Sequence, residues 1–265
     1  FIIKIGYPDK WKDYSGLQVD DSLSLYENMA NISEFFTKDA IARKVNKPVD
    51  KTEWGMTPQT INAYYNPTTN EICFPAAILQ PPFFDPTADD AMNYGGIGGV
   101  IGHEMSHGFD DQGSQFDKTG NQNNWWTAAD KKNFESRTKI LVDHFNKIEL
   151  AGKKVNGQMT LGENIGDNGG LNIAFRALQN VMKTEKLGVK DGFTPEQRFF
   201  LAWARVWAGN ARPEYLQYLM TVDVHSPNEA RVNGALPMVD SWYKAFNIKK
   251  GDKLFVPKNK RAHIW

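Results

Sequence analysis

The chain has little cysteine, no excess of charge of either sign and no long apolar run. Its 265 residues include one cysteine, Cys73, so no disulfide can form within the chain and nothing requires an oxidising compartment. Lysine plus arginine and aspartate plus glutamate both total 31, so net charge gives no reason to expect nucleic acid or an acidic membrane as partner. No apolar run approaches the roughly 18 residues of a membrane span, and no internal repeat or sustained heptad pattern is present. This composition is that of a globular protein with one large domain or two lobes.

The most informative stretch is His103-Glu104-Met105-Ser106-His107. On an α-helix, residues i and i+4 share a face, so His103 and His107 can both reach one metal ion. Imidazole is a good ligand for Zn²⁺, and a catalytic zinc site needs three protein ligands and an open position for water. Glu104 can lie over that water as a general base. The alternative interpretation is two unrelated histidines on a helix.

The best candidate for the third zinc ligand is Glu163, which a separate helix would carry to the site. Glu163 and Asp167 lie at positions i and i+4 of that helix, where two like charges repel unless a cation lies opposite them. Zinc and a ligand histidine would supply the positive charge, and Asp167 could accept the second ring N–H of that histidine. A solvated acidic face is the alternative, but the apolar neighbours Leu161, Ile165 and Leu171 favour burial.

The hydrophobic periodicity and turn residues predict that the second half of the chain is mainly helical. Cys73 is expected to be a buried apolar side chain. The zinc helix contains five glycines that each cost about 1 kcal/mol relative to alanine, so another backbone should approach it closely. The expected elements are a strand at residues 1–5, a helix over 22–45, a hairpin within 60–74, the zinc helix over 88–107, a loop over 113–126, and helices beginning near 127, 161, 195 and 213. The helix that begins near 161 is expected to end near 186.

Five motifs in order along nearly the whole chain resemble the neprilysin and endothelin-converting-enzyme family of zinc metallopeptidases. The zinc pentapeptide alone would indicate only a zincin. The five motifs are Asn62-Ala63-Tyr64-Tyr65, the run from Phe74 to Phe84, Val100-Ile101-Gly102-His103-Glu104, Gly162-Glu163-Asn164-Ile165-Gly166-Asp167, and Asp223-Val224-His225-Ser226-Pro227.

This resemblance implies a role for each matching residue. His103, His107 and Glu163 would bind one Zn²⁺ per chain, Glu104 would activate water, and Asp167 would orient a ligand histidine. Asn62 and Ala63 would hydrogen-bond the substrate backbone, Arg231 would bind a substrate carbonyl, and His225 would donate a hydrogen bond to the oxyanion. From its position alone, His225 could equally be an ordinary loop residue.

The resemblance also implies a pocket for the side chain that follows the cleaved bond, and hence a preference for a bulky hydrophobic residue there. Taken without the resemblance, its apolar residues would be interpreted as ordinary core. They are Ile78, Phe83, Val100, Val206 and Trp207.

The resemblance implies an α+β, mainly helical, thermolysin-like zincin catalytic domain with a small sheet. We expect residues 1–265 to form this domain, with a sheet-containing lobe over about 1–110 and a mainly helical lobe over about 111–265. Family members are much longer, so the helical domain that closes their active site, mostly N-terminal in sequence, is expected to be absent from this chain and to be its partner in the working protein.

Two departures bear on the source of the chain. Ala208 and Ala262 stand where animal members carry cysteines, which fits a bacterial member. The sequence does not settle the cellular compartment, and the cell envelope or secretion is favoured over the cytoplasm.

The expected function is a zinc-dependent endopeptidase acting on short peptides. The alternatives are a zinc hydrolase of non-peptide amides and a catalytically inert, zinc-stabilised binding fragment.

Overall fold

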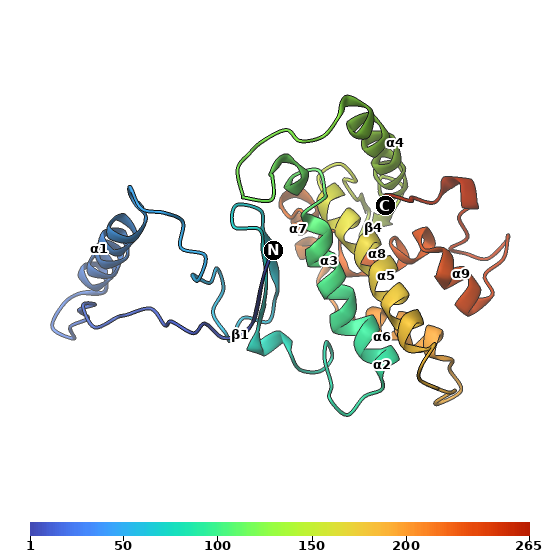
Figure 1. Cartoon of the computed structure of the whole chain (residues 1–265), viewed down its shortest axis with the longest axis horizontal. Coiled ribbons are helices and arrows are strands. Elements are labelled where there is room, and N and C mark those ends of the chain that lie inside the picture. Colours follow the sequence, from blue (N-terminus) through green and yellow to red (C-terminus); the bar gives the residue numbers. More distant parts are fainter.

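The computed structural model describes residues 1–265, and it places one small sheet beside a larger helical body (Figure 1). Strands β1 (Ile2–Gly6), β2 (Tyr64–Asn66) and β3 (Glu71–Pro75) follow the order β1-β3-β2, with β1 parallel and β2 antiparallel to β3. The apolar central strand β3 is buried along its whole length. The hairpin expected within residues 60–74 is confirmed, and β2 is left as an edge strand.

Helices hold many more residues than the strands, so the mainly helical fold class is confirmed. None of them has the length and apolar content needed to cross a membrane. They are α1 (Leu25–Lys44), α2 (Asp90–Asn93), α3 (Gly99–His107), α4 (Ala128–Phe145), α5 (Leu161–Val181), α6 (Pro195–Val206), α7 (Pro213–Val222), α8 (Asn228–Asn233) and α9 (Asp240–Phe246). A second, minimal ladder joins β4 (Glu149–Leu150) to β5 (Lys153–Lys154).

Helix starts follow the capping chemistry that the sequence predicts. The Thr194 side chain accepts a hydrogen bond from the Gln197 backbone, and the Gln197 side chain accepts one from the Thr194 backbone. Thr127 caps α4 through the Asp130 backbone N–H. Helix α5 ends at Val181, short of the predicted end near residue 186; Met182 still packs against the core, whereas residues 183–186 are exposed.

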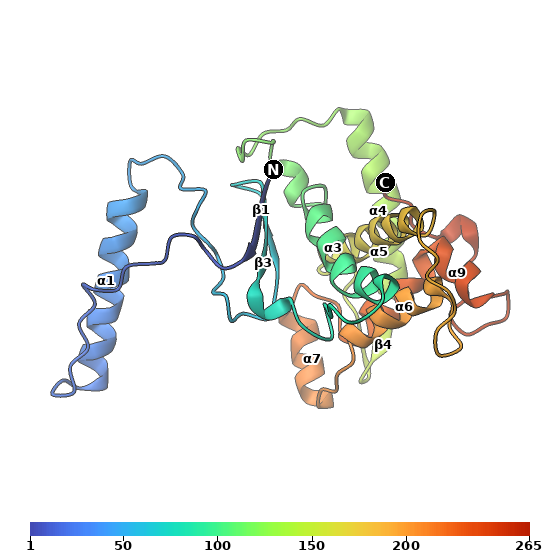
Figure 2. The same cartoon turned by 60° about the horizontal axis from the view of Figure 1, so that its bottom comes forward.

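Helix α5 lies at the centre of the helical body and is packed on both sides (Figures 1 and 2). One side joins Leu171 and Phe175 to the aromatic residues of α6, including Phe199 and Trp203. The other side contributes Leu161 and Ile165 to a cluster with Leu141 and Phe145 of α4. A third apolar cluster, which contains Ile72, Phe74 and Val100, joins the sheet to α3. The core therefore holds α3, α5 and the sheet in fixed positions.

The segment predicted as one zinc helix over residues 88–107 is divided. Helix α2 is followed by a π-helical turn, η2 (Tyr94–Gly98), and then by α3. Gly95 contacts the Phe199 backbone, and a Cβ atom on Gly102 would lie 2.8 Å from the Gly170 Cα atom. The expected close approach of another backbone is thus confirmed, and α3 and α5 lie side by side (Figure 1).

Helix α1 stands apart from the rest of the molecule, joined to it by two extended segments (Figures 1 and 2). None of its residues is buried, although Leu25, Tyr26 and Met29 are large and apolar. The returning segment is fixed to the sheet by Lys4, whose ammonium group donates to the Glu53 carbonyl at 2.6 Å and to the buried Glu71 carboxylate at 2.7 Å. This helix therefore presents an uncovered apolar surface.

Candidate metal centre and active site

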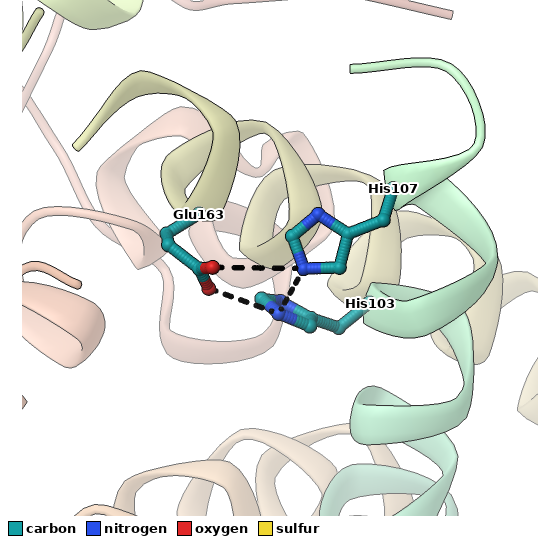
Figure 3. A group of neighbouring side chains, drawn as sticks. All are labelled: His103, His107 and Glu163. Carbon is teal, nitrogen blue, oxygen red and sulfur yellow. Dashed lines mark hydrogen bonds and ion pairs between the residues drawn. The ribbon is translucent and has the colours of Figure 1, made fainter. Parts of the chain in front are cut away.

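Helices α3 and α5 bring three potential metal ligands together. The Nε2 atoms of His103 and His107 lie 2.9 Å apart, and the Glu163 carboxylate lies 3.2 Å from the first and 3.8 Å from the second (Figure 3). These ligand atoms all lie within 4.8 Å of one another. The i, i+4 spacing on α3 places both imidazoles on the face that meets α5.

Each imidazole is oriented by a carboxylate at its other nitrogen. Asp167 Oδ1 lies 2.9 Å from His103 Nδ1, and Asp110 Oδ2 lies 2.7 Å from His107 Nδ1. Because an ionised carboxylate only accepts hydrogen bonds, both Nδ1 atoms must carry the proton, and both Nε2 lone pairs point to the same place. Asp110 is itself fixed by the backbone N–H groups of Gln112 and Gly113.

Sequence reasoning missed Asp110. It lies only three residues after His107, beyond the last residue of α3, where helical periodicity no longer says which way a side chain points. Its position close behind a candidate ligand was the available signal.

The three ligand atoms fit a zinc ion. In a tetrahedral site with ligands at about 2.0–2.1 Å, neighbouring ligand atoms are roughly 3.3 Å apart, close to the separations found here. Two imidazole lone pairs facing each other repel unless a cation lies between them. Glu163 Oε2 is also buried without a hydrogen bond, even though His103 Nε2 is near, as expected where two acceptors face a shared cation.

The electrostatics of the centre favour a positive charge on the imidazole side and an ionised ligand carboxylate. Burial opposes a charged His103, but its contacts with the Asp167 and Glu163 carboxylates raise its pKa to about 10. Burial also opposes ionisation of Glu163, yet the contact with His103 and the charges of the nearby imidazoles keep its pKa well below the usual value. The ionised carboxylates that stabilise the proton here would also attract a divalent cation.

Glu104 lies beside the ligands with 6% of its surface exposed. Burial raises the pKa of its carboxyl group, and the neighbouring imidazoles only partly oppose this change. A carboxylate with a raised pKa is a stronger base than an ordinary glutamate. Glu104 faces the same cavity as His103 and Glu163.

Arg231 is fixed before any substrate arrives. Its Nε and Nη2 atoms donate to the two Asp167 carboxylate oxygens at 2.9 Å and 2.6 Å, and its guanidinium group stacks on the Trp207 ring at 3.8 Å. Its Nη1 atom has no partner in these contacts and remains available as a donor. Trp203 adds a hydrogen bond to the Arg231 carbonyl.

His225 approaches the centre from the loop between α7 and α8. Its Nε2 atom lies 3.3 Å from Glu163 Oε2, and its Nδ1 atom lies 2.7 Å from Asp223 Oδ1. Its side chain is 48% exposed, which leaves it accessible from the cavity. The structure thus places His225 at the metal centre, where sequence position alone had left two interpretations open.

A cavity of about 480 Å³ collects most of the predicted residues. Asp167 lies outside the lining because it is fully buried behind His103. Val206 does not line the cavity, whereas Trp203, one helical turn before Trp207, does. The predicted residues that line it are Asn62, Ala63, Ile78, Phe83, Val100, His103, Glu104, His107, Glu163, Trp207, His225 and Arg231.

A larger cavity, about 750 Å³, lies between the loop over residues 113–126 and α4. It shares no residue with the metal centre, and it contains none of the catalytic groups described above. The smaller cavity is therefore the candidate active site.

Comparison with known proteins agrees with this geometry. The sequence profile of peptidase family M13 matches residues 62–262. The chain belongs to this family. It is 41% identical over 265 residues to the neutral endopeptidase of Lactobacillus helveticus, and 40% identical over 243 residues to endothelin-converting enzyme 1 of Rattus norvegicus. The first match covers 100% of this chain and 39% of the Lactobacillus protein. The second match covers 91% of this chain and 32% of the rat protein.

Solved structures give the same result. The Mycobacterium tuberculosis zinc metalloprotease ZMP1, in complex with an inhibitor, superposes with a TM-score of 0.95 at 47% sequence identity. That match covers 100% of the M13 chain and 41% of the ZMP1 chain. The expected neprilysin-like family and zincin fold are therefore confirmed, and the chain spans about two fifths of the length of the bacterial relatives it matches.

Proposed function

We propose that the protein of this chain is a zinc-dependent endopeptidase that cleaves short peptides and prefers a bulky hydrophobic residue after the cleaved bond. The observation that carries this proposal is the convergence of His103, His107 and Glu163 beside the buried base Glu104 in one cavity. Membership of family M13 supports it.

His103, His107 and Glu163 would hold one Zn²⁺. When bound there, zinc would polarise the scissile carbonyl and make water acidic enough to attack near neutral pH. Asp167 and Asp110 keep the protons of the two imidazoles on Nδ1, so the Nε2 lone pairs stay available.

Glu104 moves the proton in this proposal. Its carboxylate accepts a proton from the attacking water and later delivers it to the nitrogen of the leaving amine. Glu104 is 6% exposed, so it can hold the transferred proton between the two steps away from bulk water.

His225 and Arg231 would stabilise and orient the reacting carbonyl groups. Because Asp223 accepts from Nδ1 of His225, donation from Nε2 to the oxyanion requires a ring protonated on both nitrogens, and Asp223 stabilises that charge. The free Nη1 atom of Arg231 would donate to a substrate carbonyl. The two bonds to Asp167 reduce the conformational entropy lost when it does so.

The substrate would lie along the edge of the sheet. Asn62 and Ala63 directly precede β2, whose second edge is unpaired, so an extended peptide can add to it by backbone hydrogen bonds. The apolar residues Ile78, Phe83 and Val100 line the same cavity and would receive the side chain after the cleaved bond. This edge argues against a hydrolase of non-peptide amides.

We also propose that α1 packs against a further portion of the working polypeptide, which limits entry to short peptides. The support is the uncovered apolar surface of α1 and the greater length of the relatives. Hydrogen exchange in α1 should slow when that portion is present. Equal exchange in both forms would contradict this part of the proposal.

The central test compares wild type with Glu104→Gln, and uses the exposed Glu149→Gln as a matched control. Bound zinc and cleavage of a quenched peptide are measured for each. We expect zinc in all three proteins and cleavage in wild type and Glu149→Gln, with a loss of at least about 10²-fold in Glu104→Gln. Unchanged cleavage by Glu104→Gln would refute the mechanism. A zinc-loaded wild type without activity would favour the inert binding fragment.

The specificity is tested with peptides that differ only in the residue after the cleaved bond. Phenylalanine or leucine should be cleaved faster than aspartate, because burying an unpaired carboxylate in an apolar pocket is costly. Equal rates would show that this pocket does not select the substrate.

A further inference from the structure

A chain of buried polar side chains connects the His225 loop to α5. Ser226 Oγ donates to Asn164 Oδ1 at 2.8 Å, and Asn164 Nδ2 donates to Thr160 Oγ1 at 2.9 Å. Thr160 in turn donates to the Asn156 carbonyl at 3.1 Å. Ser226, Asn164 and Thr160 are 3%, 1% and 2% exposed, so water does not compete for these bonds.

This series of hydrogen bonds runs directly beside the metal centre. Ser226 directly follows His225, and Asn164 directly follows Glu163. The Ser226–Asn164 hydrogen bond therefore joins the neighbours of the two side chains that meet at the centre, where His225 Nε2 and Glu163 Oε2 are 3.3 Å apart.

His225 has little else to fix it. Its backbone N–H and its Nδ1 atom both contact Asp223, which belongs to the same loop. These bonds set the rotamer of the ring but not the position of the loop relative to α5. Ser226 lies next to Pro227, where α8 begins, so it fixes the loop at the point where the chain turns into the helix that carries Arg231.

We propose that Ser226 and Asn164 are positioning residues that hold the His225 imidazole at the distance from the zinc ligand Glu163 that catalysis needs. This inference rests on the proposed function, in which His225 donates to the oxyanion. Without the Ser226 hydroxyl, Asn164 Oδ1 becomes a buried acceptor without a donor, and the loop loses its one side-chain hydrogen bond to α5.

The test is a double-mutant cycle in the zinc-loaded full chain, with Ser226→Ala, His225→Ala and the double variant. Ser226→Ala should lower kcat about tenfold, less than the roughly 10²–10³-fold lost when an oxyanion donor is removed. KM and zinc content should not change. In the His225→Ala background the same substitution should change kcat less than about twofold, because Ser226 acts through His225.

Thr138→Val is the matched control, because it also removes a buried hydroxyl, one that donates only within α4, to the Glu135 carbonyl. It should leave kcat and KM unchanged. An equal loss of kcat from Ser226→Ala in both backgrounds would overturn the proposal, as would no loss in wild type.

A second readout does not depend on activity. The ¹⁵N resonances of the His225 ring, assigned by their absence in His225→Ala, should be sharp in wild type and Thr138→Val and broadened or shifted in Ser226→Ala. Unchanged His225 resonances in Ser226→Ala would overturn the positioning role. If His225→Ala keeps full activity while the resonances respond as expected, then the proposed function of His225 fails but the positioning by Ser226 stands.

Discussion

The contact between α3 and α5 at Gly102 predicts a strong effect of adding a single methyl group. A Cβ atom at this position would lie 2.8 Å from the Gly170 Cα atom and 2.9 Å from the Gly170 carbonyl oxygen. Since van der Waals contact between such atoms begins at about 3.5 Å, the two helices would have to separate by roughly 0.7 Å. Both contacting atoms belong to backbone, which cannot move aside by changing rotamer.

The expected change in the free energy of unfolding is the sum of two opposed terms. Alanine is favoured over glycine inside a helix by about 1 kcal/mol, whereas overpacking a rigid contact costs about 1–3 kcal/mol. We expect the net effect of Gly102→Ala to be a destabilisation of about 0–2 kcal/mol. Gly98→Ala is the matched control, because its Cβ atom would meet nothing nearer than 3.4 Å, and it should be stabilised by up to about 1 kcal/mol.

The two variants should also differ in their affinity for zinc. The helix that carries His103 and His107 would move relative to the helix that carries Glu163, and metal sites tolerate deviations of only about 0.2 Å. We expect zinc affinity to fall at least about tenfold in Gly102→Ala, equivalent to about 1.4 kcal/mol, and to stay unchanged in Gly98→Ala.

Urea unfolding of the zinc-free proteins measures the packing term, and competition with a chromogenic chelator measures zinc affinity. If Gly102→Ala matches Gly98→Ala in both measurements, close packing of α3 on α5 does not set the geometry of the centre.

Two further predictions concern buried titratable groups. Cys73 is fully buried, and burial raises its pKa to about 11, so a thiol reagent at pH 8 should modify it only as fast as the protein unfolds; rapid labelling of the native protein would contradict this. Burial lowers the pKa of His144, whose Nε2 atom lies 3.0 Å from the Gly234 carbonyl, so the unfolded chain binds the proton more readily. The folded chain therefore keeps its full stability above pH about 6.5, the pKa of histidine in the unfolded chain. As pH falls below this value, protonation of His144 in the unfolded chain lowers the free energy of unfolding. His144→Gln should show a smaller loss of stability between pH 7.5 and 5.5 than wild type, and equal losses would exclude this origin.

The candidate metal ligands could be predicted from the sequence because helical spacing fixes geometry over one turn. His103 and His107 needed only the i, i+4 rule, and apolar neighbours on one face indicated that Glu163 is buried. Features that depend on another part of the chain were not readable. The π-helical turn before α3 accommodates the contact between Gly95 and the Phe199 backbone, and no local pattern identifies that partner.

Dependence on distant parts of the chain also explains the smaller differences between the sequence predictions and the structure. Trp203 lines the cavity where Val206 was expected, because the face of α6 turned to the centre depends on how α6 packs against η2 and α9. The apolar residues of α1 correctly indicated a helix, but hydrophobicity says only that a side chain should be covered and not what covers it.

The charges around the metal centre connect its folding to its chemistry. Four acidic side chains, Glu104, Asp110, Glu163 and Asp167, lie around three imidazoles and a single guanidinium group, those of His103, His107, His225 and Arg231. Carboxylates buried together repel each other unless positive charge compensates them, and Arg231 compensates mainly Asp167. The remaining negative charge is concentrated where the two Nε2 lone pairs point. In the folded chain the imidazoles and Arg231 already keep the pKa values of Glu163 and Asp167 low, so a divalent cation would take the place of protons at the ligand atoms and would stabilise the fold when bound.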